Sequence, residues 1–213
     1  MNDLESLVRR RRSVRTFTGG DIDRRTLGKL VEMALWAPSS CNRQTVHFRF
    51  VKNRRLIDAV APAAFNQPIL GQPITLAVVC VDTTRYRNTT LKNNLAPCLD
   101  AGLAMENFLL AATGMEIGTC VVAGRLNQPL VRSVLHLPDE WIIAAFIALG
   151  VAGEGQPPPE RDFAELHMSF DDESLGRNGE TYGSHVDARR RWARAGFDTG
   201  RYYRHPKEGL PVY

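Results

Sequence analysis

Two short stretches set the fold of this chain: residues 11–17, with the sequence RRSVRTF, and residues 37–44, with the sequence APSSCNRQ. The first stretch gathers three arginines and a serine hydroxyl, whose side chains alternate in direction if the segment is extended. Guanidinium groups offer paired donors to phosphate oxygens and stabilise nearby negative charge. Phosphate is therefore a natural ligand here, although a solvated basic turn would give the same pattern.

The segment between the two stretches has the pattern of an amphipathic helix. Asp23 is a good N-cap, and Pro38 ends the helix. Residues 37–44 connect this helix to residues 46–50, which alternate apolar and polar side chains as a half-buried strand does. On its own, such a polar stretch could be only a connecting loop. The apolar face of the helix consists of Leu27, Leu30, Val31, Ala34 and Leu35.

The rest of the chain mixes helices and strands. Apolar residues 74–81 predict a central strand covered on both faces, and residues 141–149 predict a second buried strand. Apolar side chains surround the helix predicted at residues 99–113, as in a helix buried within a domain or at a subunit interface. We therefore expect one α+β domain over residues 1–163, followed by an arginine-rich extension over residues 164–213.

Composition narrows the class of protein. The chain has 213 residues, of which 44% are hydrophobic and 23% charged, so a packed core is expected. No apolar run approaches the roughly 20 residues that a membrane-spanning helix needs, and the first residues lack a secretory signal. We therefore expect a cytoplasmic protein that does not bind membranes. The four scattered cysteines are predicted to stay reduced.

Charge leaves two kinds of anionic ligand open. The formal net charge is +4, and arginines cluster at residues 9–12 and 189–191, which suits a phosphate cofactor or a nucleic acid. The sequence has no helix-turn-helix, zinc-finger or RNP pattern, so charge alone supports a non-enzymatic nucleic-acid binder. The histidines lack metal-ligand spacing, so no metal site is predicted. There is no GxGxxG or Walker sequence, and a nicotinamide would therefore bind only transiently.

Together, the two N-terminal stretches resemble the signature of the nitroreductase family, Arg-x-Ser-x-Arg-x-Phe followed by Ala-Pro-Ser-x-x-Asn-x-Gln. The resemblance continues through residues 111–120, AATGMEIGTC, and residues 147–150, IALG, and covers about residues 4–165. Two departures stand out. Gln44 is followed by Thr45 where the family often has Pro-Trp, and Glu116 replaces a glycine of the phrase Leu-Gly-Leu-Gly-Thr.

The resemblance implies an α+β fold in which helices flank a central mixed or antiparallel sheet. It further implies an interlocked homodimer that binds flavin mononucleotide (FMN) at its interface. The extension is longer and more basic than the resemblance needs, and we expect it to wrap on the dimer surface or the active site. One chain would contact the phosphate, the ribityl chain and the pyrimidine edge through Arg11, Arg12, Ser13 and Arg15, with Arg161 closing on the phosphate. In the same chain, the backbone of Val121, Ala123 and Gly124 would approach the reactive nitrogen of the flavin ring. The other subunit would line the flavin with Pro38, Ser39, Ser40 and Asn42.

The implied activity is a ping-pong transfer of hydride from NADH or NADPH to a small organic acceptor, such as a nitroaromatic, a quinone or an enone. The flavin carries the chemistry, and no side chain is predicted to be catalytic. A specialised flavin-dependent dehydrogenase or a flavin-consuming biosynthetic enzyme is the first alternative. A protein that holds flavin without turnover is the second.

Overall fold

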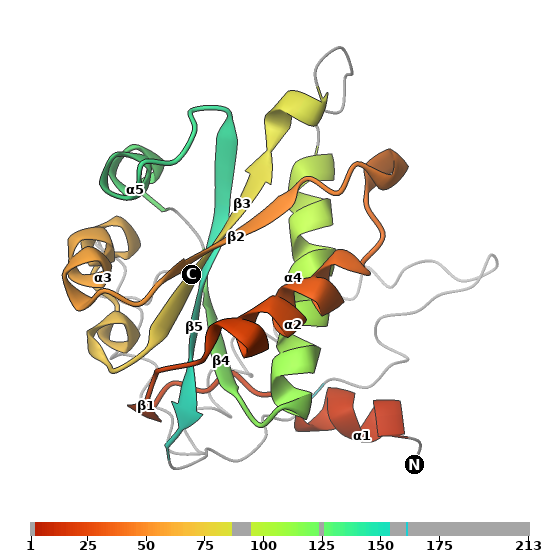
Figure 1. Cartoon of the computed structure of the whole chain (residues 1–213), viewed down its shortest axis with the longest axis vertical. Coiled ribbons are helices and arrows are strands. Elements are labelled where there is room, and N and C mark those ends of the chain that lie inside the picture. Colours follow the sequence, from red (N-terminus) through yellow and green to blue (C-terminus); the bar gives the residue numbers. More distant parts are fainter. Residues whose placement is uncertain (1–2, 87–94, 124–125, 154–160, 162–213) are drawn as a thin grey trace, which may run out of the picture. The chain divides into compact units, whose positions relative to one another are not determined.

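The computed structural model describes residues 3–86, 95–123, 126–153 and Arg161. The chain divides into two units, residues 1–156 and 157–213, and the helices and strands of the described residues all belong to the first unit. The helices are α1 (Asp3–Arg10), α2 (Arg24–Leu35), α3 (Arg54–Val60), α4 (Ala96–Gly114) and α5 (Gln128–Leu135) (Figure 1). The strands are β1 (Phe17–Gly19), β2 (Val46–Val51), β3 (Thr75–Asp82), β4 (Gly118–Val122) and β5 (Trp141–Ala152).

These elements confirm the predicted α+β class. The proposed extension at residues 164–213 lies outside the described residues, so its limit and its role stay predictions. Within the described ranges, no helix has both the length and the apolar character that crossing a membrane requires.

The strands form one antiparallel sheet in the order β1-β5-β3-β2, and β4 also pairs with β5. Strand β3 lies between β2 and β5, which confirms the central position predicted for residues 74–81. Its side chains from Leu76 to Val81 are all 0% exposed. A parallel bridge between Ser13 and Thr119 joins the N-terminal segment to β4.

Helices cover both faces of the sheet (Figure 1). Successive residues of β3 point to opposite faces, so that Ala77 packs in the core under α2 and α4 and Val78 packs in the core under α3 and α5. Under α4, the ring of Phe108 stacks on Phe48 with 5.0 Å between ring centroids. Truncating a buried phenylalanine of this kind to alanine costs about 3–5 kcal/mol.

Local signals explain where the helices begin. Asp23 caps α2 by accepting the backbone N–H of Thr26 at 2.9 Å, as predicted. The Thr26 hydroxyl donates to the same carboxylate and lowers the pKa of Asp23. Asn127 caps α5 in the same way through the N–H of Leu130.

The end of α4 is less favourable. Gly114 is the last residue of the helix, but the left-handed conformation that follows falls on Glu116, whose φ is 57°. The Ile117 N–H donates to the Ala112 carbonyl at 2.9 Å and closes the turn. Glu116 therefore holds, at some energetic cost, a conformation that glycine adopts freely.

Candidate functional site

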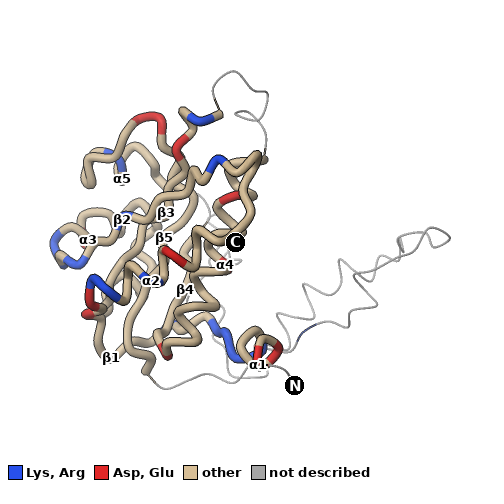
Figure 2. The backbone as a smooth tube through the Cα atoms, turned by 45° about the vertical axis from the view of Figure 1, so that its right-hand side comes forward, with Lys and Arg blue, Asp and Glu red and all other residues tan. Residues whose placement is uncertain are grey.

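The first predicted stretch lies beside β4 and the C-terminal half of α4. The Val14 N–H donates to the Thr119 carbonyl at 2.8 Å, and the Arg11 guanidinium lies 3.7 Å from the Glu106 carboxylate on α4. Arg10 reaches the Thr113 carbonyl near the end of the helix. We call residues 10–15, together with the part of α4 that they contact, the arginine end of α4. Figure 2 shows basic residues where α1 ends, next to this part of the molecule.

Short contacts hold the arginines close to their own backbone. Arg12 donates to the Arg11 carbonyl at 2.7 Å, and Arg15 donates to the Ser13 carbonyl at 3.2 Å. A guanidinium has five N–H donors, so it can bridge from such a carbonyl to a phosphate oxygen. Ser13 is exposed next to these cations.

The thiol nearest to the arginine end is not a nucleophile. Burial raises the pKa of Cys120 on β4, and the positive charge of Arg15 opposes this shift without reversing it. Cys120 is 6% exposed and is not part of a disulfide. The thiol therefore stays protonated at neutral pH.

The second predicted stretch forms a strained loop between α2 and β2. Its 3₁₀ turn, Ser40–Asn42, contains two residues with left-handed backbone, Cys41 at φ 52° and Asn42 at φ 53°. Gln44 follows at φ 51°. Left-handed backbone costs roughly 1–2 kcal/mol for a residue with a side chain, and it persists only where the surroundings fix it.

A buried carboxylate fixes this loop. Asp100 of α4 is 2% exposed, and its Oδ1 accepts both the backbone N–H and the hydroxyl of Ser40, each at 3.0 Å. The Gln44 N–H donates to Ser39 Oγ at 3.0 Å, and the Arg43 guanidinium donates to the Ser40 carbonyl at 2.9 Å. We call residues 38–44 with Asp100 the serine end of α4.

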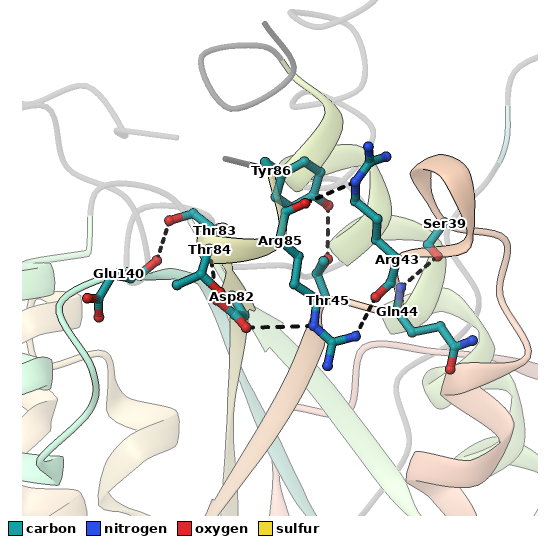
Figure 3. Close-up of polar contacts among 10 residues, drawn as sticks. All are labelled: Ser39, Arg43, Gln44, Thr45, Asp82, Thr83, Thr84, Arg85, Tyr86 and Glu140. Atoms are coloured by element: carbon teal, nitrogen blue, oxygen red, sulfur yellow. Dashed lines mark hydrogen bonds and ion pairs between the residues drawn. The ribbon is translucent and has the colours of Figure 1, made fainter. Parts of the chain in front are cut away.

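Buried hydroxyls complete the support behind the loop. The Tyr86 hydroxyl donates to Asp100 Oδ2 at 2.5 Å. It also lies 2.9 Å from the Thr45 hydroxyl (Figure 3). Burial raises the pKa of Tyr86 to about 12, so this phenol remains a proton donor at neutral pH. Tyr86 and Thr45 are both 0% exposed.

Two arginines connect the loop to the turn after β3. Arg43 donates to the Arg85 carbonyl at 3.0 Å, and Arg85 donates back to the Arg43 carbonyl at 2.8 Å (Figure 3). The Arg43 guanidinium also lies 5.7 Å from the centre of the Tyr86 ring. The Asp82 carboxylate forms an ion pair with the Arg85 guanidinium at 3.8 Å. The loop is thus held from both sides.

The structure brings each predicted stretch to its own end of α4. Positions 100 and 113 of this helix, which Ser40 and Arg10 contact, are separated by about 20 Å at 1.5 Å per residue. Glu106, which Arg11 contacts, lies about 9 Å along the helix from position 100. The exposed Pro38 and Asn42 therefore belong to the serine end, and Arg11, Ser13 and Arg15 belong to the arginine end. Within one chain the two sets do not converge on a single position.

The remaining predicted residues fall in several places. Val121 is half-buried on β4, two positions beyond the residue that bonds the N-terminal segment, and Ala123 is exposed just after this strand. Gly124 lies outside the described residues. Arg161 is exposed and belongs to the second unit, so its position relative to the arginine end is not defined.

The two ends suit different parts of FMN. The arginine end supplies cations for a phosphate dianion, and the serine end supplies small polar side chains on a fixed backbone. The space between the loop, α2 and α4 is tightly filled, with only about 10 Å³ free among residues that include Pro38, Ser39 and Asp100. A cofactor would therefore lie on the surface of this loop and not beneath it.

Comparison with known proteins agrees with these features. The model of the Nitroreductase family matches residues 8–86 and 66–151, which is more than half of the chain and includes both ends of α4. The chain belongs to the nitroreductase family. It is 26% identical over 220 residues to the 4-nitrobenzoate reductase of a Nocardioides species, with 78% of this chain and 89% of that protein covered.

Two further proteins are similar to this chain, one in sequence and one in fold. The protein named FMN reductase (NADPH) of Bacillus subtilis is 26% identical over 164 residues, with 70% of this chain and 66% of that protein covered. Nitroreductase A from Vibrio parahaemolyticus superposes with a TM-score of 0.78 at 24% identity and covers 91% of this chain and 86% of that chain. At this identity the likeness shows the fold.

Sequence reasoning missed the residues behind the loop. Asp100, Tyr86 and Thr45 were not predicted to have any role at the site, yet they fix Ser40. One signal was present, because Asp100 is the only charged residue in the otherwise apolar stretch 95–105. An acidic residue is almost never fully buried unless it is paired, so its place in a buried helix points to a bonded partner.

Proposed function

We propose that this chain is an FMN-dependent oxidoreductase that takes hydride from NADH or NADPH and passes it to a small organic acceptor. One relative is named 4-nitrobenzoate reductase and another FMN reductase (NADPH), which supports both the nicotinamide donor and a nitroaromatic acceptor. A quinone or an enone-like acceptor would use the same hydride chemistry. When bound, FMN supplies the hydride transfer, and the chain binds and orients the reactants.

The observation that carries the proposal is the arrangement of the two stretches inside the region matched by the family. Cations stand next to β4 at one end of α4, and a loop of fixed backbone stands at the other. This division is what a flavin shared between two copies of the chain requires. A solvated basic turn or a plain connecting loop would explain neither the contacts with β4 nor the buried carboxylate.

Each predicted FMN contact then has a task. Arg11, Arg12, Ser13 and Arg15 bind the phosphate, the ribityl chain or the pyrimidine edge, where positive charge stabilises the anion that gathers on reduction. The backbone of Val121 and Ala123, with Gly124, approaches the reactive nitrogen, and Arg161 closes on the phosphate. The second copy presents Pro38, Ser39, Ser40 and Asn42.

An apolar face of α4 supports the homodimer. Leu95, just before α4, and Leu99 and Leu103 within it recur at every fourth position and are 79%, 61% and 38% exposed. Apolar side chains grouped in this way mark an interaction surface. We propose that a second copy of the chain covers this face and completes two FMN sites.

The thiols fit a reducing compartment. Cys41, Cys80, Cys98 and Cys120 are all free, and cytoplasmic proteins keep their thiols in this state. We therefore propose that the enzyme works in the cytoplasm.

Initial-rate kinetics test the reaction. With the FMN-loaded protein, NADPH or NADH and either 4-nitrobenzoate or a simple quinone as acceptor, double-reciprocal plots should give parallel lines, because the oxidised nicotinamide leaves before the acceptor binds. Intersecting lines would show a ternary complex and contradict the ping-pong order. No turnover with any of these acceptors would favour a protein that only holds flavin.

A further inference from the structure

Besides Arg85, which bonds to Arg43, one core side chain outside every predicted FMN contact holds the serine end in its conformation. Cys41, Asn42 and Gln44 all have left-handed backbone, so the loop would relax if nothing opposed it. Two of its restraints are internal, since Gln44 bonds to Ser39 and Arg43 bonds to Ser40. The bonds from Ser40 to Asp100 instead tie the loop to a helix in the core.

We propose that Asp100 is a positioning residue for the FMN-facing loop, acting through Ser40 and itself held by Tyr86. This inference rests on the proposed function. The Asp100 side chain is buried behind the loop and does not face the cofactor, so its role is to fix where Ser39, Ser40 and Asn42 present their polar atoms. The tyrosine hydroxyl fixes the second carboxylate oxygen and thereby the orientation of the first.

The chemistry of the carboxylate makes the proposal specific. Oδ1 accepts two hydrogen bonds from Ser40, and Oδ2 accepts one from Tyr86. An asparagine at this position keeps an oxygen for Ser40 and turns its NH₂ group toward Tyr86, whose hydroxyl can accept and still donate to Thr45. An alanine keeps none of these three bonds. Asp100→Asn should therefore restore what Asp100→Ala removes.

Two measurements on the full chain test this role. The first is the dissociation constant of FMN, from quenching of flavin fluorescence, which should rise about tenfold or more in Asp100→Ala because two bonds to a charged acceptor are lost. In Asp100→Asn it should stay within about threefold of wild type. The second is amide hydrogen exchange of Ser40 without FMN, which should speed up about tenfold or more in Asp100→Ala and much less in Asp100→Asn.

Two further variants separate positioning from general stability. Tyr86→Phe keeps the packing of the ring and removes the hydroxyl that bonds to Oδ2 and to Thr45, so its FMN affinity should lie between wild type and Asp100→Ala even if the alanine variant fails to fold. Thr75→Val is the matched control, because it removes another buried hydroxyl, the one that bonds to the Gly20 carbonyl in a different part of the sheet. It should lower the melting temperature and leave FMN affinity and Ser40 exchange unchanged.

The outcomes are distinct. Wild-type affinity and wild-type Ser40 exchange in Asp100→Ala would overturn the proposal, as would equal losses in Asp100→Ala and Asp100→Asn. Equal weakening of FMN binding by Thr75→Val would also overturn it, because the effect would then follow stability alone. If the wild-type chain bound no FMN, the proposed function would fail, and the exchange of the Ser40 amide would still decide whether Asp100 fixes the loop.

Discussion

The two ends of α4 are built in opposite ways. At the serine end, a strained loop is tied to the buried Asp100, whose other oxygen is tied to Tyr86. At the arginine end, the side chains bond mainly to carbonyls of their own segment, and the ion pair between Arg11 and Glu106 is 3.7 Å long and partly exposed. Rigidity and charge are therefore supplied by separate parts of the chain, and a shared cofactor would need both.

The largest effect is expected from separating the two copies of the chain. Leu99→Glu combined with Leu103→Glu places charges on the apolar face of α4, where burial without a partner is strongly unfavourable. We expect a monomer whose FMN affinity falls by more than about a hundredfold, because neither end alone holds the cofactor. Light scattering coupled to gel filtration, together with the flavin absorbance of the eluted peak, measures both quantities.

A matched control uses another exposed apolar residue. Val151 on β5 is 56% exposed, and Val151→Glu adds the same kind of charge away from α4. It should leave the dimer and the bound flavin intact. A monomer that still carried its flavin in the α4 variant would show that one copy of the chain is sufficient.

A smaller effect should follow the loss of one cation at the arginine end. Arg11→Ala should weaken FMN binding about tenfold to a hundredfold, since a charged hydrogen bond to a phosphate is worth roughly 1.5–3 kcal/mol. Arg9→Ala removes the same charge from the same helix end, where Arg9 is paired with Glu5 at 2.9 Å and is 71% exposed. It should change the affinity less than about twofold. An equal loss of FMN affinity in the two variants would show that the arginine end acts only through its overall positive charge.

The strained backbone of Glu116, near the arginine end, should not be needed for FMN binding, in contrast to the strained loop at the serine end. Glu116→Gly relieves the left-handed backbone at φ 57° and should raise the free energy of unfolding by about 1 kcal/mol. FMN affinity should not change. Met115→Gly is the control, because Met115 has φ −96° and gains nothing from glycine, so this variant should be less stable than wild type. Chemical denaturation of the proteins without FMN gives both values.

The smallest effect concerns the strand that leads away from the serine end. His47 of β2 stacks on Trp141 at 4.4 Å, and burial lowers its pKa from 6.5, with Arg85 acting in the same direction and Asp82 opposing it. Because the unfolded chain takes up this proton more readily than the folded chain, stability should fall as the pH drops below 6.5.

His47→Phe keeps the stacked ring and removes the titration, so the loss of stability between about pH 7 and pH 5 should be smaller than in wild type. His136 is exposed, and His136→Asn should leave that loss unchanged. Thermal melts across this pH range measure it. An identical pH dependence in wild type and His47→Phe would show that His47 does not contribute.

The elements that rest on short-range patterns were predictable from the sequence. Asp23 caps α2 by accepting the backbone N–H of a residue only three positions along the chain. The uninterrupted apolar run of β3 likewise reflects the burial of this strand on both faces. The contact between Asp100 and Ser40 spans 60 positions, and no periodicity predicts which loop a buried acid will hold. Likewise, the replacement of a glycine by Glu116 was visible, but its φ of 57° depends on how the chain leaves α4 for β4.

The candidate site was predictable only in part for the same reason. The residue types in RRSVRTF and APSSCNRQ indicate what each stretch can bind, and only the structure shows that these stretches lie beside β4 and α4. Their separation along α4 is a property of the folded chain. The tasks assigned to Arg11, Ser13, Arg15 and Asn42 toward FMN stay predictions until cofactor binding is measured.

The decisive test of FMN chemistry in this chain is the visible spectrum of the purified protein, recorded before and after NADPH or NADH is added without oxygen. We predict a yellow protein whose flavin band near about 450 nm bleaches when the nicotinamide is added. A protein that stays colourless even after FMN is supplied would contradict its assignment as an FMN-dependent oxidoreductase.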